Sequence, residues 1–208
     1  VWIGVSPEAF ELTADEAVRT SYIEDDFEDY YSSQPAQNFT SQVFFNNVRV
    51  GILAFAAGIL LCVVTVFVLA YNGANVGVAG GLFTHVGESE RFWGLILPHG
   101  LLEISAVIVS GAAGLRLGWS VISPGDETRW RAVTAQGRDV GNVVIGLVVA
   151  FAVAGLIEGF VTGRPWPTSV RVGIGVLAFV AFWGWTIATG RRAAELEAAQ
   201  LSASGPPR

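Results

Sequence analysis

Long apolar runs separated by short polar stretches occupy most of this chain from about residue 41 onward. Because a membrane-spanning helix needs about 20 predominantly apolar residues, this pattern predicts an all-α, polytopic membrane helical bundle. We expect five apolar segments, at about 44–71, 72–86, 92–122, 140–161 and 169–189. The second segment is short and rich in glycine, so it forms either a short tilted span or a re-entrant helix.

Residues 1–40 differ from the rest of the chain and predict an acidic extramembrane lead-in. They hold nine acidic side chains and one arginine, whereas residues 41–208 hold nine acidic side chains and eleven arginines. Thr13 and Glu16 have the spacing of a capping box, which predicts a helix over about 13–31. Its acidic run favours a solvated or interfacial face over a cation site.

Two further regions follow the lead-in. Residues 41–190 form the predicted transmembrane domain, and residues 191–208 form a tail that begins as a charged helix and ends disordered. Arginines gather in the loop between the third and fourth segments and at 191–192, which places both in the cytoplasm by the positive-inside rule. The amino end is then outside if all five segments cross, and inside if the second is re-entrant.

Composition narrows the class of protein. Hydrophobic residues make up 52%, charged residues 14%, and the mean hydropathy is +0.52. The weakly basic membrane body disfavours nucleic-acid binding, and the single Cys62 disfavours disulfides and cysteine metal clusters. No catalytic triad order, phosphate-binding loop or HExxH motif is visible, so an enzyme is disfavoured without being excluded. The chain has no methionine, even at position 1, which suggests that it is processed or part of a longer protein.

Glycines recur at four-residue spacing in three of the apolar segments. In lipid, such small-residue faces let helix backbones approach closely. They serve either packing inside one bundle or a contact between copies of the chain; we expect a homo-oligomer, most simply a dimer, through the stripe in the second segment. The predicted packing residues are Gly73, Gly77, Gly81, Gly114, Gly118, Gly155 and Gly159.

Polar residues inside the apolar segments mark a candidate site, because burying ionisable groups singly in a membrane is costly. His99 and Glu103 share one face of a helix, and Glu158 lies at a similar predicted depth. They form a packing network, a divalent metal site such as a zinc site, or part of an ion or proton pathway. The other predicted intramembrane polar residues are Asn72, Asn75, His85, Arg116 and Asn142.

Several short strings resemble the stage II sporulation protein M family over about residues 40–190. They are FFNN at 44–47, YNG at 71–73, LPHGLLE at 97–103, GAAGLRLG at 111–118 and IEGF at 157–160. The resemblance implies a multi-pass protein of the bacterial inner membrane. It also implies a scaffold or assembly factor for peptidoglycan and membrane remodelling, sporulation-related in the namesake.

The acidic lead-in resembles the longer family members of non-sporulating, high-GC bacteria. That likeness implies envelope-remodelling or RDD-type membrane proteins as partners, besides the lipid bilayer. The alternative function is a metal-dependent intramembrane enzyme or an ion or small-molecule transporter that uses His99, Glu103 and Glu158. No cofactor other than a divalent metal is indicated.

Overall fold

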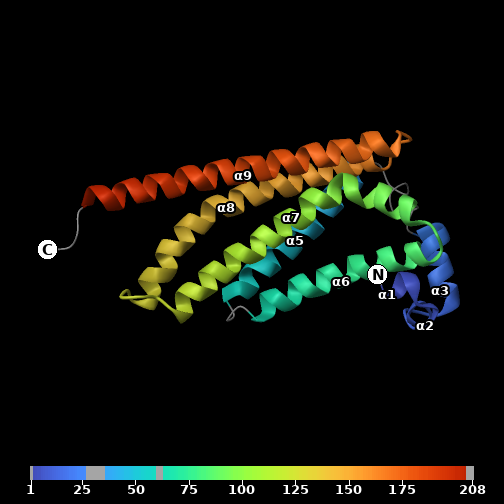
Figure 1. The fold of residues 1–208 in the computed structure, drawn as a ribbon, viewed down its shortest axis with the longest axis horizontal. Coiled ribbons are helices and arrows are strands. Elements are labelled where there is room, and N and C mark those ends of the chain that lie inside the picture. Colours follow the sequence, from blue (N-terminus) through green and yellow to red (C-terminus); the bar gives the residue numbers. More distant parts are fainter. Residues whose placement is uncertain (1, 27–35, 60–62, 205–208) are drawn as a thin grey trace.

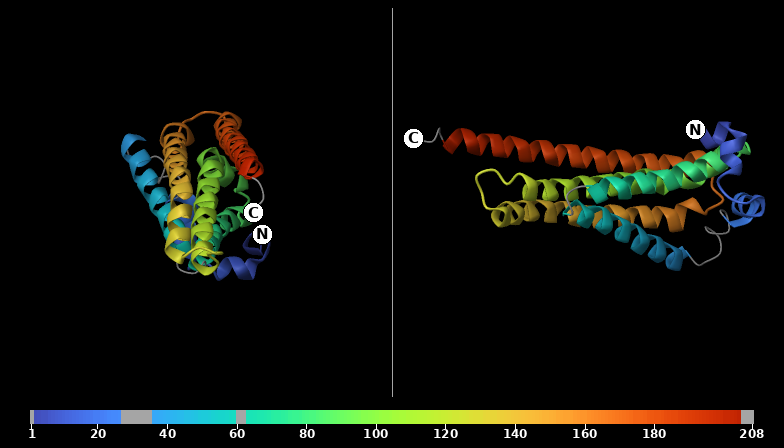
Figure 2. Two further views of the ribbon diagram at one scale, coloured as in Figure 1. Left: turned by 90° about the vertical axis from the view of Figure 1, so that its left-hand side faces the viewer. Right: turned by 90° about the horizontal axis from the view of Figure 1, so that it is seen from below.

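The computed structural model describes residues 2–26, 36–59 and 63–204. Every regular element within these ranges is helical, which confirms the predicted all-α membrane bundle. Four helices are long and apolar enough to cross a membrane, and a shorter apolar helical stretch covers Phe44–Gly58. The helices run side by side along the long axis of the molecule (Figures 1 and 2).

The first two apolar segments divide at a different place from the one predicted. Helix α5 covers Ala36–Ile59 and α6 covers Val63–His85, so Asn72 and Gly73 lie inside α6 and do not separate two segments. The expectation of a short or re-entrant second segment is therefore wrong. A helix in an apolar setting tolerates glycine and asparagine because its backbone bonds remain internal. At 23 residues, α6 is long enough to span the membrane fully.

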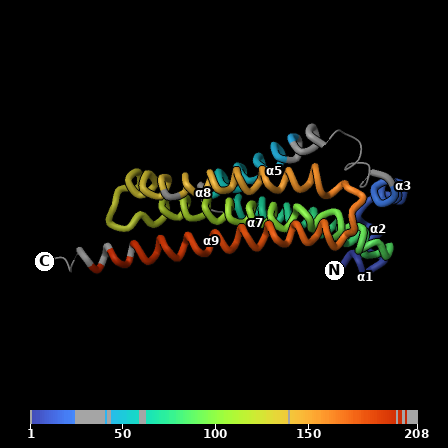
Figure 3. The backbone as a smooth tube through the Cα atoms, turned by 90° about the horizontal axis from the view of Figure 1, so that it is seen from above, coloured from blue at the N-terminus to red at the C-terminus, as the bar shows by residue number. Residues whose placement is uncertain are grey.

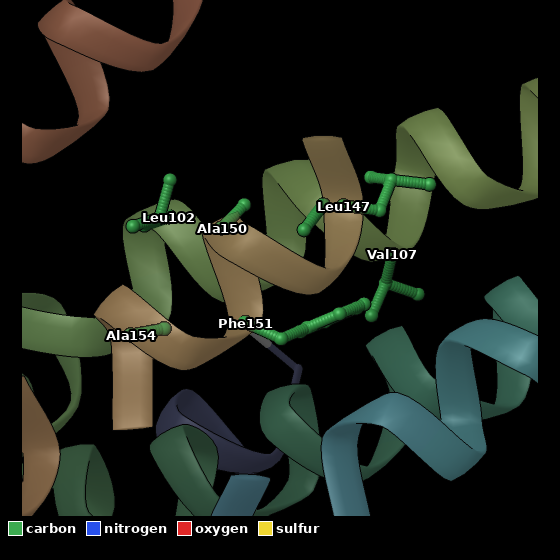
Figure 4. Packing of buried hydrophobic residues seen from close by; sticks show 7 residues of the cluster. Leu102, Val107, Leu147, Ala150, Phe151 and Ala154 are labelled. Atoms are coloured by element: carbon green, nitrogen blue, oxygen red, sulfur yellow. The ribbon is translucent and has the colours of Figure 1, made fainter. Parts of the chain in front are cut away.

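Helix α7 (Ser89–Ile122) forms the centre of the bundle. It contacts α5, α6, α8 (Arg129–Ile157) and α9 (Thr168–Ser204), and Figure 3 shows α9 and α8 running beside it. The largest apolar core joins α7 to α8 (Figure 4), where the buried side chains are Leu102, Ala106, Val107, Leu147, Ala150, Phe151 and Ala154. This interface holds the two helices that carry the candidate polar residues.

Helices α5 and α7 meet backbone to backbone. A Cβ atom on Gly58 would lie 2.0 Å from the carbonyl carbon of Gly114, and one on Gly114 would lie 2.3 Å from the oxygen of Phe55. One turn away, the Ser110 hydroxyl donates a 2.7 Å hydrogen bond to the carbonyl of Gly51. The glycines at this crossing therefore serve packing within one chain.

The acidic lead-in folds into α1 (Trp2–Val5), α2 (Pro7–Glu11), α3 (Glu16–Ser21) and a π-helical turn, η1 (Tyr22–Asp26). The predicted capping box does not form, because the Thr13 hydroxyl donates to the carbonyl of Phe10 and the helix starts at Glu16. Residues 27–31 of the predicted helix lie outside the described residues. Ile23 packs with Phe83 and Phe92, so the lead-in is docked on the ends of α6 and α7.

Helix α9 continues well past the predicted end of the fifth segment. It extends to Ser204 and projects beyond the other helices (Figure 1). Residues 191–199 are mostly alanine, arginine, glutamate and leucine, which favour helix without tertiary contacts.

The lead-in and the α7–α8 loop lie at opposite ends of the bundle (Figure 1), an arrangement that five full crossings require.

Candidate functional site

His99, Glu103 and Glu158 lie together between α7 and α8. One potential ligand atom from each residue lies within 4.8 Å of the others. Nε2 of His99 lies 3.8 Å from Oε1 of Glu158. The structure therefore brings together residues that are 55 positions apart in sequence but share a depth in the bundle.

A change of helix type at the end of α8 positions Glu158. The α-helix ends at Ile157, and Glu158–Thr162 form a π-helical turn, η2. Such wide turns are rare and occur often at functional sites. Here the turn places Glu158 and Thr162 on the side of α8 that faces His99, and both side chains are buried.

The Thr162 hydroxyl orients the imidazole ring of His99. Nδ1 of His99 lies 3.2 Å from Oγ1 of Thr162, and this hydroxyl donates at 3.4 Å to the carbonyl of Ile157. Because the hydroxyl proton is directed to that carbonyl, Nδ1 of His99 is favoured as the donor in the contact. The neutral ring then presents the lone pair of Nε2 to the carboxylate of Glu158.

The two carboxylates have different surroundings. Glu103, which is half-buried, is held by a side-chain hydrogen bond with Asn47 of α5. The Glu158 side chain is only 4% exposed, and its Oε2 has no hydrogen-bond partner among the described residues. A buried carboxylate oxygen without a partner is costly, so the cluster has capacity to bind a cation or a proton.

Three residues around the cluster were not among the site residues predicted from the sequence. Asn47 appeared only within a family string, and Thr162 gives no signal in an apolar run. Arg171, at the start of α9, donates from Nη1 to the carbonyl of Thr162 at 2.6 Å. Its position as an arginine inside an otherwise apolar segment is the one signal that could have identified it.

The remaining predicted polar residues lie elsewhere. Asn72 and His85 are half-buried, and the His85 ring stacks on Phe10 with centroids 4.1 Å apart. Asn75 and Arg116 are exposed in this single chain. They occupy faces of α6 and α7 that no described helix covers.

A separate apolar groove runs between α8 and α9. Its volume is about 590 Å³, and it shares no lining residue with the polar cluster. Its few polar groups include the amide of Asn142 and the indole of Trp185, whereas the rest of the lining is aliphatic or aromatic. The groove therefore offers an apolar surface and no second cluster of ionisable groups.

The chain matches a known family model and is similar to two proteins of one organism. Residues 2–163 match the family model described as Stage II sporulation protein M. One similar protein, an uncharacterized protein of Methanocaldococcus jannaschii, is 31% identical over 129 residues, which cover 61% of this chain and 72% of that protein. A second uncharacterized protein of the same organism is 29% identical over 123 residues, 58% of this chain and 54% of that protein.

The chain thus spans about half the length of the second relative. No solved structure matches. The region matched by the family model contains the lead-in and all three residues of the polar cluster and ends before α9.

Proposed function

We propose that this chain, which belongs to the stage II sporulation protein M family, is an integral membrane scaffold or assembly factor for remodelling of the cell envelope. The proposal places it in the plasma membrane as a multi-pass protein with its carboxyl end in the cytoplasm. Envelope-remodelling and RDD-type membrane proteins are the partners to seek.

The uncovered surface of two spanning helices carries this proposal. In the most apolar 18-residue stretch of each helix, only 11% of the residues of α6 and 6% of those of α9 are buried within the chain. The corresponding share for α7 is 56%. Helices in a membrane associate by close packing of their faces, and these two helices leave most of their faces free for such contacts. A chain with one well-covered central helix and two exposed ones suits assembly with other membrane proteins, while lipid covers what remains.

Photo-crosslinking in cells tests the scaffold role directly. A photoreactive residue at Leu177 or Val180, which are 72% and 58% exposed on α9, should give discrete protein adducts. The matched control is Ala106, which is fully buried in α7 and should give none. Adducts with lipid alone at every exposed position of α6 and α9 would reject the proposal.

A metal-dependent enzyme or a transporter is the second candidate, favoured by the buried Glu158 carboxylate. Complementation separates the two. If the protein is a scaffold, the double variant His99→Ala, Glu103→Ala should restore normal growth and a normal envelope to a strain that lacks the gene. Loss of complementation at normal abundance and folding would favour the second candidate.

A further inference from the structure

The geometry points to a divalent transition-metal site at His99, Glu103 and Glu158, for an ion of the zinc class. This inference stands apart from the scaffold role, because metal binding is measured on the purified chain whatever that chain assembles with. His99 and Glu103 come from α7 and Glu158 from the start of η2, so a bound ion would cross-link two helices.

The ligand set and its spacing suit such an ion. Zinc is bound by imidazole nitrogen and carboxylate oxygen at about 2.0–2.2 Å, which puts ligand atoms about 3.4 Å apart in a tetrahedral site. The three donor atoms already lie within 4.8 Å of one another, with His99 and Glu158 at 3.8 Å. Rotation of the two carboxylates that shortens these distances by up to about 1.4 Å completes the approach.

The acceptor groups of His99 and Glu158 favour the binding of a cation. The lone pair of His99 Nε2 and the Oε1 of Glu158 are both acceptors when the ring is neutral and the carboxyl is ionised. Oε2 of Glu158 also has no hydrogen-bond partner within the described ranges. One divalent ion would coordinate Nε2 of His99 and a carboxylate oxygen of Glu158 together.

Outer contacts hold the ligands as they do in known metal sites. A ligating histidine usually gives its other ring N–H to an acceptor, which fixes the tautomer; Thr162 takes that role at 3.2 Å from Nδ1. Asn47 holds Glu103 through a side-chain hydrogen bond. Three protein ligands leave a fourth position for water, as in open zinc sites.

Metal binding to the purified chain tests the site. The protein should carry a cleavable affinity tag without histidines, be treated with a chelator in mild detergent, and then be titrated with Zn²⁺. We expect one ion per chain by elemental analysis and an increase in thermal stability. Co²⁺ should give visible absorption bands that report nitrogen and oxygen ligands in a site of low symmetry.

The two histidines of the chain provide a matched control. His99→Ala should lose the stoichiometric ion, while His85→Ala, which removes a ring stacked on Phe10, should retain it. Glu158→Gln keeps the shape of the side chain and should also lose the ion, which guards against unfolding of the alanine variant. Thr162→Val should weaken Zn²⁺ binding by about 10–100-fold.

Two results would overturn the inference. One is the absence of stoichiometric Zn²⁺ and Co²⁺ binding by folded wild type at micromolar metal. The other is equal retention of the ion by wild type and by folded Glu158→Gln. Either would assign the cluster to a hydrogen-bonded packing network.

Discussion

Gly175 of α9 lies directly against the backbone carbonyl of Pro98 in α7, and a Cβ atom at position 175 would lie 2.3 Å from that oxygen. Pro98 lies inside α7 and immediately precedes His99. The closest crossing of α7 and α9 therefore falls one residue from the polar cluster. Only a residue without a side chain permits this approach.

Replacement of Gly175 by alanine should destabilise the bundle, by about 1–3 kcal/mol as for other overpacked contacts. Gly173→Ala is the matched control, because a Cβ atom at that position meets nothing within 4 Å; it should be neutral or slightly stabilising, since alanine favours helix over glycine. Thermal unfolding in one detergent compares the two variants. Equal stability of both would contradict the close contact.

The glycine stripe of α6 tests the proposed homo-oligomer. Gly73 and Gly77 have nothing within 4 Å of a built Cβ atom, whereas Gly81 is covered by Ile3 of α1. A contact between copies is therefore expected at Gly77 and not at Gly81. Gly77→Leu should convert a dimer to a monomer by mass measurement in detergent.

Gly141→Leu controls for the added side chain, because position 141 in α8 is equally open; this variant should remain dimeric. A monomeric wild type at micromolar concentration would show that the stripe has no role in dimerisation.

Arg91 anchors the lead-in to the membrane body. Its Nη1 donates to the carbonyl of Ile23 at 3.0 Å, and its Nη2 donates to that of Glu24 at 3.3 Å. Arg91→Ala should release η1 and increase cleavage of residues 16–26 in limited proteolysis by several-fold. Arg164→Ala, which changes an exposed arginine in the loop before α9, should leave the cleavage rate unchanged.

Docking of the lead-in should also affect the ionisation of Tyr22. Burial raises the pKa of its phenol above the usual 10.0, because the charged form is poorly solvated there. The stabilising contribution is present below about pH 10 and lost as pH rises through the raised pKa. The lead-in should therefore detach only in strong alkali.

A spectrophotometric titration of tyrosinate measures this shift. The difference between wild type and Tyr22→Phe isolates one of the four tyrosines and should have a midpoint above 10. In an Arg91→Ala background the midpoint should return towards the ordinary pKa. If the titration midpoint of Tyr22 is the same with and without Arg91→Ala, the raised pKa does not depend on docking of the lead-in by Arg91.

The sequence alone determined the helical membrane architecture of this protein and the helix face that two of its site residues share. The length and apolarity of the segments predicted a helical membrane bundle, because backbone groups in lipid must bond internally. The four-residue spacing of His99 and Glu103 predicted that they share a helix face. The same reasoning misplaced the break between α5 and α6, because glycine and asparagine end helices in water more readily than in an apolar setting.

Tertiary structure decided which distant groups meet. The contact of Glu158 with His99 depends on the register between α7 and α8, which their interlocked core sets. The π-helical turn at Glu158 and the contacts from Asn47 and Thr162 have no local signature. Periodicity gives the face on which a side chain lies, but its partner across the bundle is fixed by close packing between helices far apart in the chain.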